Sequence, residues 1–262
     1  MYSEEHESYL KTIKKSNFLV RFTQISIILL FILIWQFLAD NNLINTFITS
    51  SPKEVVTTII DLHNSNNLYN HIWITIYETL ISFILGTLIG IVIATILWWN
   101  KFLSRVLDPY LTILNSLPKV ALGPIIIIWA GAGMNSIIIM ALFISVIITI
   151  INVYQGFIET DPIKIKLMKS FKATKAQTYF KLILPSTFPV IISTLKINIS
   201  MSLIGVIMGE FLVSKEGIGY LIMYGSQVFN LNLVISGIII LCVVATLMYY
   251  VVLYIEKKLI KN

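Results

Sequence analysis

Long apolar stretches without a charged residue alternate with short polar ones along most of the chain. Phe22 to Ala39 and Thr79 to Asn100 contain no charged residue, and each is close to the roughly 20 apolar residues that a helix needs to cross a bilayer. Residues 120–158 and 217–255 are also uncharged, but each run is too long for one span. Each run therefore contains a helix plus a turn or part of a second helix.

Turn residues divide these longer runs. Two glycines and a polar pair in Gly131–Ser136 predict that a helix stops and reverses there. Gly217–Gly219 and the polar run 225–227 predict another loop. The six expected spans cover residues 22–39, 79–100, about 109–129, 135–157, 188–209 and 233–255. All are expected to be α-helices, because lipid offers backbone groups no hydrogen-bond partner.

Lysine and arginine predict the orientation of these spans. With the N-terminus inside, fifteen of the 19 basic residues fall in cytoplasmic segments and only Lys53 and Lys215 in outer loops. Cytoplasmic loops carry such an excess, so both termini are expected in the cytoplasm. With 57% apolar and 12% charged residues, the chain is predicted to be an all-α multi-pass protein of the cytoplasmic membrane. The net charge of +6 then reports topology and does not indicate nucleic-acid binding.

The apolar runs and the positions of the basic residues also predict how the chain is organised. It consists of a cytoplasmic tail over 1–21, a first transmembrane helix over 22–39, an extracytoplasmic segment over 40–73, a five-span core over 74–256 with a cytoplasmic loop over 158–187, and a cytoplasmic tail over 257–262. Within the outer segment, Ser51 as N-cap, Pro52 at the first position and Glu54 in the first turn predict a short surface helix. The three histidines have no metal-binding spacing, so no metal site is expected.

A Gly-x-x-x-Gly pattern lies inside the second span, at Gly86 and Gly90. Small residues at this spacing let two helices approach closely. The partner is either another helix of the same chain or a helix of a second copy, and the pattern does not distinguish the two.

The longest polar loop of the core, Lys166 to Pro185, is basic and amphipathic. Helical spacing gathers Leu167, Met168 and Phe171 on one face, with lysines around them. Such a helix either lies on the membrane surface or fills a groove on a soluble partner.

This loop resembles the cytoplasmic loop of binding-protein-dependent ABC transporter permeases, whose pattern is E-A-A-x-x-x-G, nine residues, then I-x-L-P. Lys166, Leu167 and Met168 stand at the E-A-A positions and Lys172 at the glycine. Leu182, Leu184 and Pro185 fill the I-x-L-P end.

From Ser51 to Leu259 the chain is similar to permeases of the nitrate, sulfonate and taurine branch. The matching pieces are Ser51-Pro52, Leu107-Asp108-Pro109, Leu117-Pro118-Lys119, Gly123-Pro124, Trp129-Ala130-Gly131, Thr160-Asp161-Pro162, Leu184-Pro185, Glu210-Phe211-Leu212 and Glu216-Gly217-Ile218-Gly219-Tyr220. The order of these pieces over most of the chain carries the resemblance.

The resemblance implies a type I ABC importer permease fold and a transport subunit that is not itself an enzyme. It implies a coupling helix docked on a cytoplasmic ABC ATPase present in two copies, an extracytoplasmic substrate-binding protein, and a second permease copy as a homodimer. The solute would be small and sulfonate-, taurine- or nitrate-like, or alternatively a vitamin or pyrimidine precursor. ATP and Mg would belong to the ATPase, with no cofactor in this chain. The implied coupling residues are Lys166, Leu167, Met168, Phe171, Lys172, Ala173, Leu182, Leu184 and Pro185.

Two departures from the family pattern carry expectations. Lys172 replaces a glycine that permits positive φ, so either the two short helices run on continuously or Lys172 bears a strain of order 1 kcal/mol. Lys166 replaces an acidic residue. The hypothesis is that the groove of the partner ATPase is correspondingly acidic.

Lys119 and Lys196 lie within or near spans, where a charge at the bilayer centre costs about 2.5–3.5 kcal/mol. Pro118 and Pro124 bracket Lys119 and should break its helix, which suits the wall of a translocation path. The two lysines then either attract an anionic solute or extend to the cytoplasmic interface.

Glu78 and Glu210 lie near the outer ends of their spans. Together with Gly217 and Gly219 they are candidates for an outer gate or a binding-protein contact, against the simpler reading as interfacial carboxylates. An intramembrane enzyme is a less favoured alternative, because the ionisable residues noted within spans are scattered lysines rather than a catalytic pair.

Overall fold

A computed structural model describes residues 4–65 and 67–260, and its regular elements are all helices. In order these are α1 (Glu4–Asp40), α2 (Thr46–Thr49), α3 (Pro52–Asn64), α4 (Asn67–Trp99), α5 (Lys101–Ser116), η1 (Lys119–Leu122), α6 (Gly123–Ala130), α7 (Met134–Ile158), α8 (Pro162–Ser170), α9 (Lys175–Thr178), η2 (Tyr179–Ile183), α10 (Leu184–Val213), α11 (Ile218–Gln227) and α12 (Leu231–Ile260). The all-α prediction is confirmed. Residues 1–3 and 261–262 of the two expected tails, with Lys261, lie outside the described residues.

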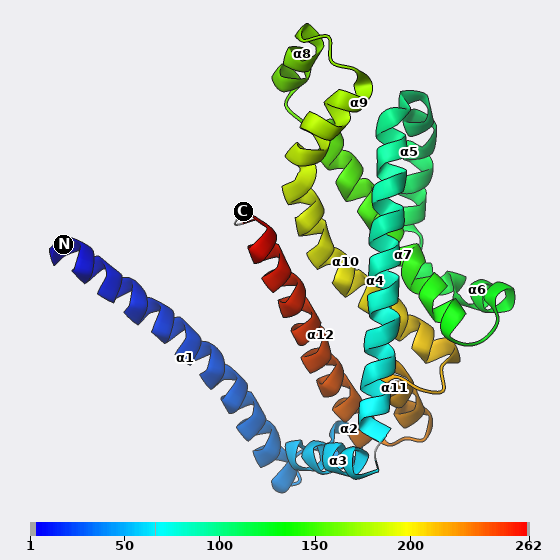
Figure 1. The fold of residues 1–262 in the computed structure, drawn as a ribbon. Coiled ribbons are helices and arrows are strands. Elements are labelled where there is room, and N and C mark those ends of the chain that lie inside the picture. The colour runs from blue at the N-terminus through cyan, green and yellow to red at the C-terminus, as the bar shows by residue number, and fades with distance from the viewer. Residues whose placement is uncertain (1–3, 66, 261–262) are drawn as a thin grey trace.

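Within residues 4–65 and 67–260, five helices are long and apolar enough to cross a membrane, and the number is six when the bent pair of α5 with η1 and α6 is counted as one span. Helices α8 and α9 lie at one end of the bundle, and α2, α3 and α11 lie at the other (Figure 1). The N-terminal part of α1 and the C-terminal part of α12 extend toward the side of the bundle that carries α8 and α9 (Figure 1). This arrangement agrees with the expected topology, in which both termini and the loop 158–187 share one side.

The centre of the bundle is α7, which packs along both α4 and α10. A Cβ on Gly86 would collide with Ser145 of α7, and a Cβ on Gly90 would collide with Thr149. The Gly-x-x-x-Gly pattern therefore serves packing within the chain, and these two positions have no room for a partner helix from a second copy.

Helix α1 stands apart from this bundle (Figure 1). The most apolar 18-residue stretch of α1 contains no buried residue, and α1 meets α3 where the N–H of Lys53 donates to Gln36 Oε1 at 3.1 Å. The helix already begins at Glu4, so the described part of the expected tail 1–21 continues into the first span as one helix.

The span expected over about residues 109–129 is a bent pair of helices, with its break where Pro118 was expected to interrupt the helix. Helix α5 ends at Ser116, and the chain then turns by 92° into η1 and α6. Pro118 causes the break, because it precedes η1 with an extended ψ of 91°. Pro124, by contrast, starts α6, since a proline is tolerated in the first turn of a helix.

Three other boundaries differ from those expected. Helix α4 begins at Asn67 rather than Thr79, because His71, Thr75 and Glu78 lie on one face of its first turns and are buried against protein. Helix α10 continues from α9 through the π-turn η2, so the Leu184-Pro185 step lies within a helix. Such π-turns are rare and occur mostly as single turns inside longer helices. Residues 218–227, expected as a loop, form α11.

Candidate functional site

The loop between α7 and α10 carries its own helix, α8. Asp161 accepts a hydrogen bond from the backbone N–H of Ile163 at 2.8 Å, and Pro162 occupies the first turn, so capping defines where α8 begins. Ile165 is half-buried and packs against the core cluster around Tyr179. One face of α8 is thereby held against the bundle.

The opposite side of α8 carries exposed apolar side chains. Ile163, Leu167 and Phe171 are 74%, 54% and 72% exposed, and their spacing of four residues places them in one row. We call these three residues the α8 ridge. Met168, expected on the same face, is half-buried instead, because it is rotated by about 100° from Leu167 on a helix.

Lys172 ends α8 in the left-handed conformation, with φ of 54°. The N–H of Ala173 donates to Met168 O at 3.0 Å and that of Lys172 to Lys169 O at 2.9 Å, a Schellman motif that usually has glycine at this position. Of the two alternatives from the sequence, the strained lysine is therefore the one observed.

The second half of the loop is anchored to the bundle. The ammonium of Lys175 donates to the backbone oxygen of Trp99 and lies 5.8 Å from the ring centre of Trp98. Thr174 and Gln177 form a capping box that starts α9. The predicted coupling residues Ala173, Leu182 and Leu184 are half-buried and Pro185 is exposed.

The two membrane lysines each have a partner within the chain. The ammonium of Lys119 donates to Asn115 O at 2.7 Å, near the end of α5. The ammonium of Lys196 forms an ion pair with Glu256 of α12 at 2.9 Å. The structure thus gives the two lysines separate partners on separate elements and does not bring them together in one site.

Glu78 and Glu210 meet between the outer ends of α4 and α10. They are 2% and 1% exposed, so the simpler reading as interfacial carboxylates is wrong. Glu78 lies three residues after Thr75 on α4, which brings its carboxyl group near that of Glu210. Thr75 donates its hydroxyl hydrogen to Glu210 Oε1 at 2.6 Å.

The same cluster holds the first turn of α11. The N–H groups of Gly217, Ile218 and Gly219 donate to His71 Nδ1 at 2.9 Å, Thr75 Oγ1 at 2.8 Å and Glu210 Oε2 at 2.5 Å. These bonds satisfy backbone donors that a helix start leaves free. Gly217 has φ of 104°, and a Cβ on either glycine would collide with Glu210.

Two members of this cluster, His71 and Thr75, are absent from the residues predicted as functional. Their signal in the sequence is the spacing of His71, Thr75 and Glu78 by four and three residues, which places three polar side chains on one helix face. His71 lies in the segment expected to be extracytoplasmic, 40–73, whereas Thr75 and Glu78 lie beyond it, so the sequence did not predict one helix face for all three.

Replacing Thr75 by Val is expected to destabilise the protein by about 1–3 kcal/mol, because the buried N–H of Ile218 loses its acceptor. Thr79→Val is the matched control. Both residues are fully buried on α4, but Thr79 only donates to the carbonyl of Thr75 in its own helix. Thermal unfolding of the two purified variants in detergent measures the difference. Equal unfolding midpoints would show that the hydroxyl of Thr75 does not hold α11.

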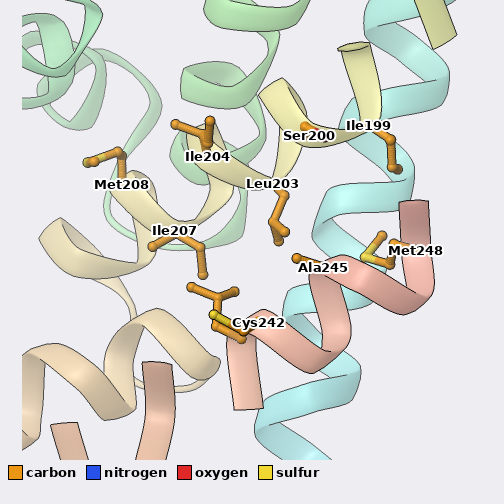
Figure 2. Close-up of a pocket in the computed structure, with 10 residues that line it drawn as sticks. Ile199, Ser200, Leu203, Ile204, Ile207, Met208, Cys242, Ala245 and Met248 are labelled. Carbon is orange, nitrogen blue, oxygen red and sulfur yellow. The ribbon is translucent and has the colours of Figure 1, made fainter. Parts of the chain in front are cut away.

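An apolar groove of about 340 Å³ lies between α10 and α12. Figure 2 shows Leu203, Ile207 and Met208 from α10 opposite Cys242 and Met248 from α12. Apart from Ser200, its lining side chains are hydrocarbon and sulfur. The groove therefore offers no set of polar groups with which to recognise a polar solute.

The chain is similar in sequence to known transport permeases. The chain is 29% identical over 230 residues to the protein described as an aliphatic sulfonates transport permease, SsuC, of Bacillus subtilis (strain 168), covering 88% of this chain and 83% of that protein. It is 28% identical over 192 residues to the formylaminopyrimidine transport permease protein ThiX of Halalkalibacterium halodurans, covering 73% and 76%.

In fold, the chain resembles an inward-facing crystal structure of the MetNI methionine ABC transporter. The TM-score is 0.66 at 18% sequence identity, over 73% of this chain and 95% of that chain. Residues 86–261 match the sequence pattern of a protein family described as the inner membrane component of binding-protein-dependent transport systems. The chain belongs to this family, the inner membrane components of binding-protein-dependent transport systems.

Proposed function

We propose that this chain is one half of a dimeric, ATP-driven importer that carries a small organic solute such as a sulfonate. The chain is the membrane-spanning permease subunit of an ABC importer and not an enzyme. Its sequence contains no G-x-x-x-x-G-K-[ST] phosphate-binding motif. ATP and Mg²⁺ would accordingly be held by a separate cytoplasmic ATPase, in two copies.

The observation that carries this proposal is the α8 ridge. An apolar row at the cytoplasmic end of a membrane bundle suits a groove on a soluble partner, because an amphipathic helix gains affinity by burying i, i+4 anchors. The ridge is flanked by Lys164, Lys166 and Lys169. We propose that an acidic ATPase groove receives it, with the predicted coupling residues around it.

The translocation path is proposed to follow the elbow formed by α5, η1 and α6. Pro118 and Pro124 are exposed there, and Lys119 is half-buried. Large apolar side chains of the elbow, among them Ile128 and Trp129, are also exposed, as befits a surface that a second permease copy would cover. Lys196 is proposed to hold α10 to α12 through Glu256 rather than to attract solute.

The solute class is tested with the extracytoplasmic binding protein that stimulates the assembled transporter. Calorimetry should show that this protein binds short alkylsulfonates, the class in the name of the Bacillus subtilis relative. Tight binding of a formylaminopyrimidine with no heat from sulfonates would instead support the alternative, a vitamin-precursor importer. The import function itself is contradicted if no binding protein raises the ATPase rate of the reconstituted complex.

A further inference from the structure

A second cavity, of about 790 Å³, opens at the outer end of the bundle. Its walls come from α4 with Trp73, Tyr77 and Glu78, from the turn before α7, and from the loop between α10 and α11 with Lys215 and Glu216. A volume between roughly 300 and 1,000 Å³ is that of sites for small molecules. Unlike the groove of Figure 2, this cavity has charged groups in its lining.

One residue that lines this cavity, Glu78, has a buried oxygen without a hydrogen-bond partner. The side chain of Glu78 is only 2% exposed, and its Oε2 has no hydrogen-bond partner. The neighbouring Glu210 does not share this need, because Thr75 and Gly219 donate to its two oxygens. Within residues 4–65 and 67–260, neither carboxyl forms an ion pair with a lysine or arginine. Buried acceptors in native proteins normally have a donor.

The groups around this oxygen select the kind of donor. Trp73 and Tyr77 stand one helical turn apart on α4, line the same cavity and are 64% and 47% exposed. Aromatic faces attract ammonium groups through their ring electrons, and an ammonium offers three donors and no acceptor. The other charged groups of the lining, Lys215 and Glu216, are exposed on the loop, and Glu216 accepts a hydrogen bond from Asn70.

We propose that this cavity binds a primary ammonium group, which donates to Glu78 Oε2 between Trp73 and Tyr77. The ammonium belongs either to a zwitterionic solute, whose anionic end Lys215 would meet, or to a lysine side chain of the docked binding protein. The biological role of this site, at the outer side of the membrane, rests on the proposed import function. Binding itself is a property of this chain alone.

The test is saturation-transfer NMR on the full-length chain in lipid nanodiscs with ethylammonium. Binding should weaken at least tenfold in Glu78→Gln and stay unchanged in Glu54→Gln, a matched control on the outer helix α3. Trp73→Leu, which alters a largely exposed side chain and leaves the buried cluster intact, should also weaken binding. If Glu78→Gln misfolds, the Trp73→Leu variant still tests the proposal. Equal affinity in all variants, or no saturation of ethylammonium in wild type, overturns the proposal, because water alone would then satisfy the oxygen.

Three further probes separate the sources of the ammonium. A solute source predicts that 2-aminoethanesulfonate binds more tightly than both ethylammonium and 2-hydroxyethanesulfonate, and that Lys215→Met removes this advantage. A protein source predicts that Nα-acetyl-lysine amide binds as well as ethylammonium and that the sulfonate adds nothing. Because these measurements need neither the ATPase nor the binding protein, they can fail while import of ammonium-free solutes persists. They can equally succeed if the proposed solute class is wrong.

Discussion

Gly205→Val is expected to prevent stable assembly of the helix bundle. A Cβ on Gly205 of α10 would overlap the backbone of Ala141 on α7, at the contact between the two most buried helices. A backbone atom cannot rotate away as a flexible side chain can, so α7 and α10 would have to separate along their length. Overpacking of this kind typically costs about 1–3 kcal/mol and occasionally more, and we expect this substitution to reach the upper end.

Size-exclusion chromatography after a heating series measures this effect on purified protein. The matched control is Ile204→Val, the same introduced residue at the neighbouring position, where the side chain is 47% exposed. We expect Ile204→Val to keep the wild-type melting midpoint, and Gly205→Val to aggregate or to yield little protein. A Gly205→Val protein as heat-resistant as the control would mean that α7 and α10 do not approach this closely.

Removing the α8 ridge is expected to abolish stable recovery of the ATPase while leaving the permease folded. The double variant Leu167→Ser and Phe171→Ala truncates two exposed side chains that the bundle does not bury. Truncation of a central aromatic anchor in an interface costs about 2–4 kcal/mol, which corresponds to at least a tenfold weaker complex. Co-purification of the ATPase and binding-protein-stimulated ATPase activity are the two measurements.

Phe47→Ala is the control for this experiment, because Phe47 is 66% exposed but belongs to α2 at the outer end. An acidic ATPase groove further predicts that Lys166→Glu with Lys172→Glu weakens the complex, and that added salt weakens the wild-type complex. If the ridge variant co-purifies as much ATPase as the wild-type chain does, the ATPase does not dock on α8.

The structure also links the two ends of the molecule through one element. Helix α10 continues α9 and η2, starts close behind the α8 ridge, and carries Glu210 in its last turn. Its 30 residues extend about 45 Å. A displacement at the docking end would therefore be transmitted along α10 to the cluster that holds α11, in keeping with rigid-body changes that switch transporters.

Much of the fold was predictable from the sequence. The lengths of the apolar runs predict α7 and α12 within a few residues, because lipid requires helices of about that length. The cap chemistry at Ser51 predicts α3 in the same way, since Ser51 Oγ does accept from Glu54 N at 3.3 Å. The loop between α7 and α10 was predictable because the order of its residues is visible in the sequence itself.

Contacts between distant helices were not predictable. The sequence places Thr75 and Glu210 135 residues apart, yet the structure joins them by a hydrogen bond of 2.6 Å. The 92° elbow after α5 was expected only as a break at Pro118, because a proline interrupts a helix without setting the direction in which the chain continues.

The sequence by itself thus determined the membrane class and predicted the orientation and the place of the cytoplasmic loop, since hydropathy, charge and caps act over a few neighbouring residues. Only the tertiary structure decided that Gly86 and Gly90 pack within the chain, that Lys196 is neutralised by Glu256, and that Glu78 is buried with a free oxygen. These outcomes depend on which helix faces meet. Helices in lipid choose partners by close fit and polar pairing, which become visible only when the faces are placed side by side.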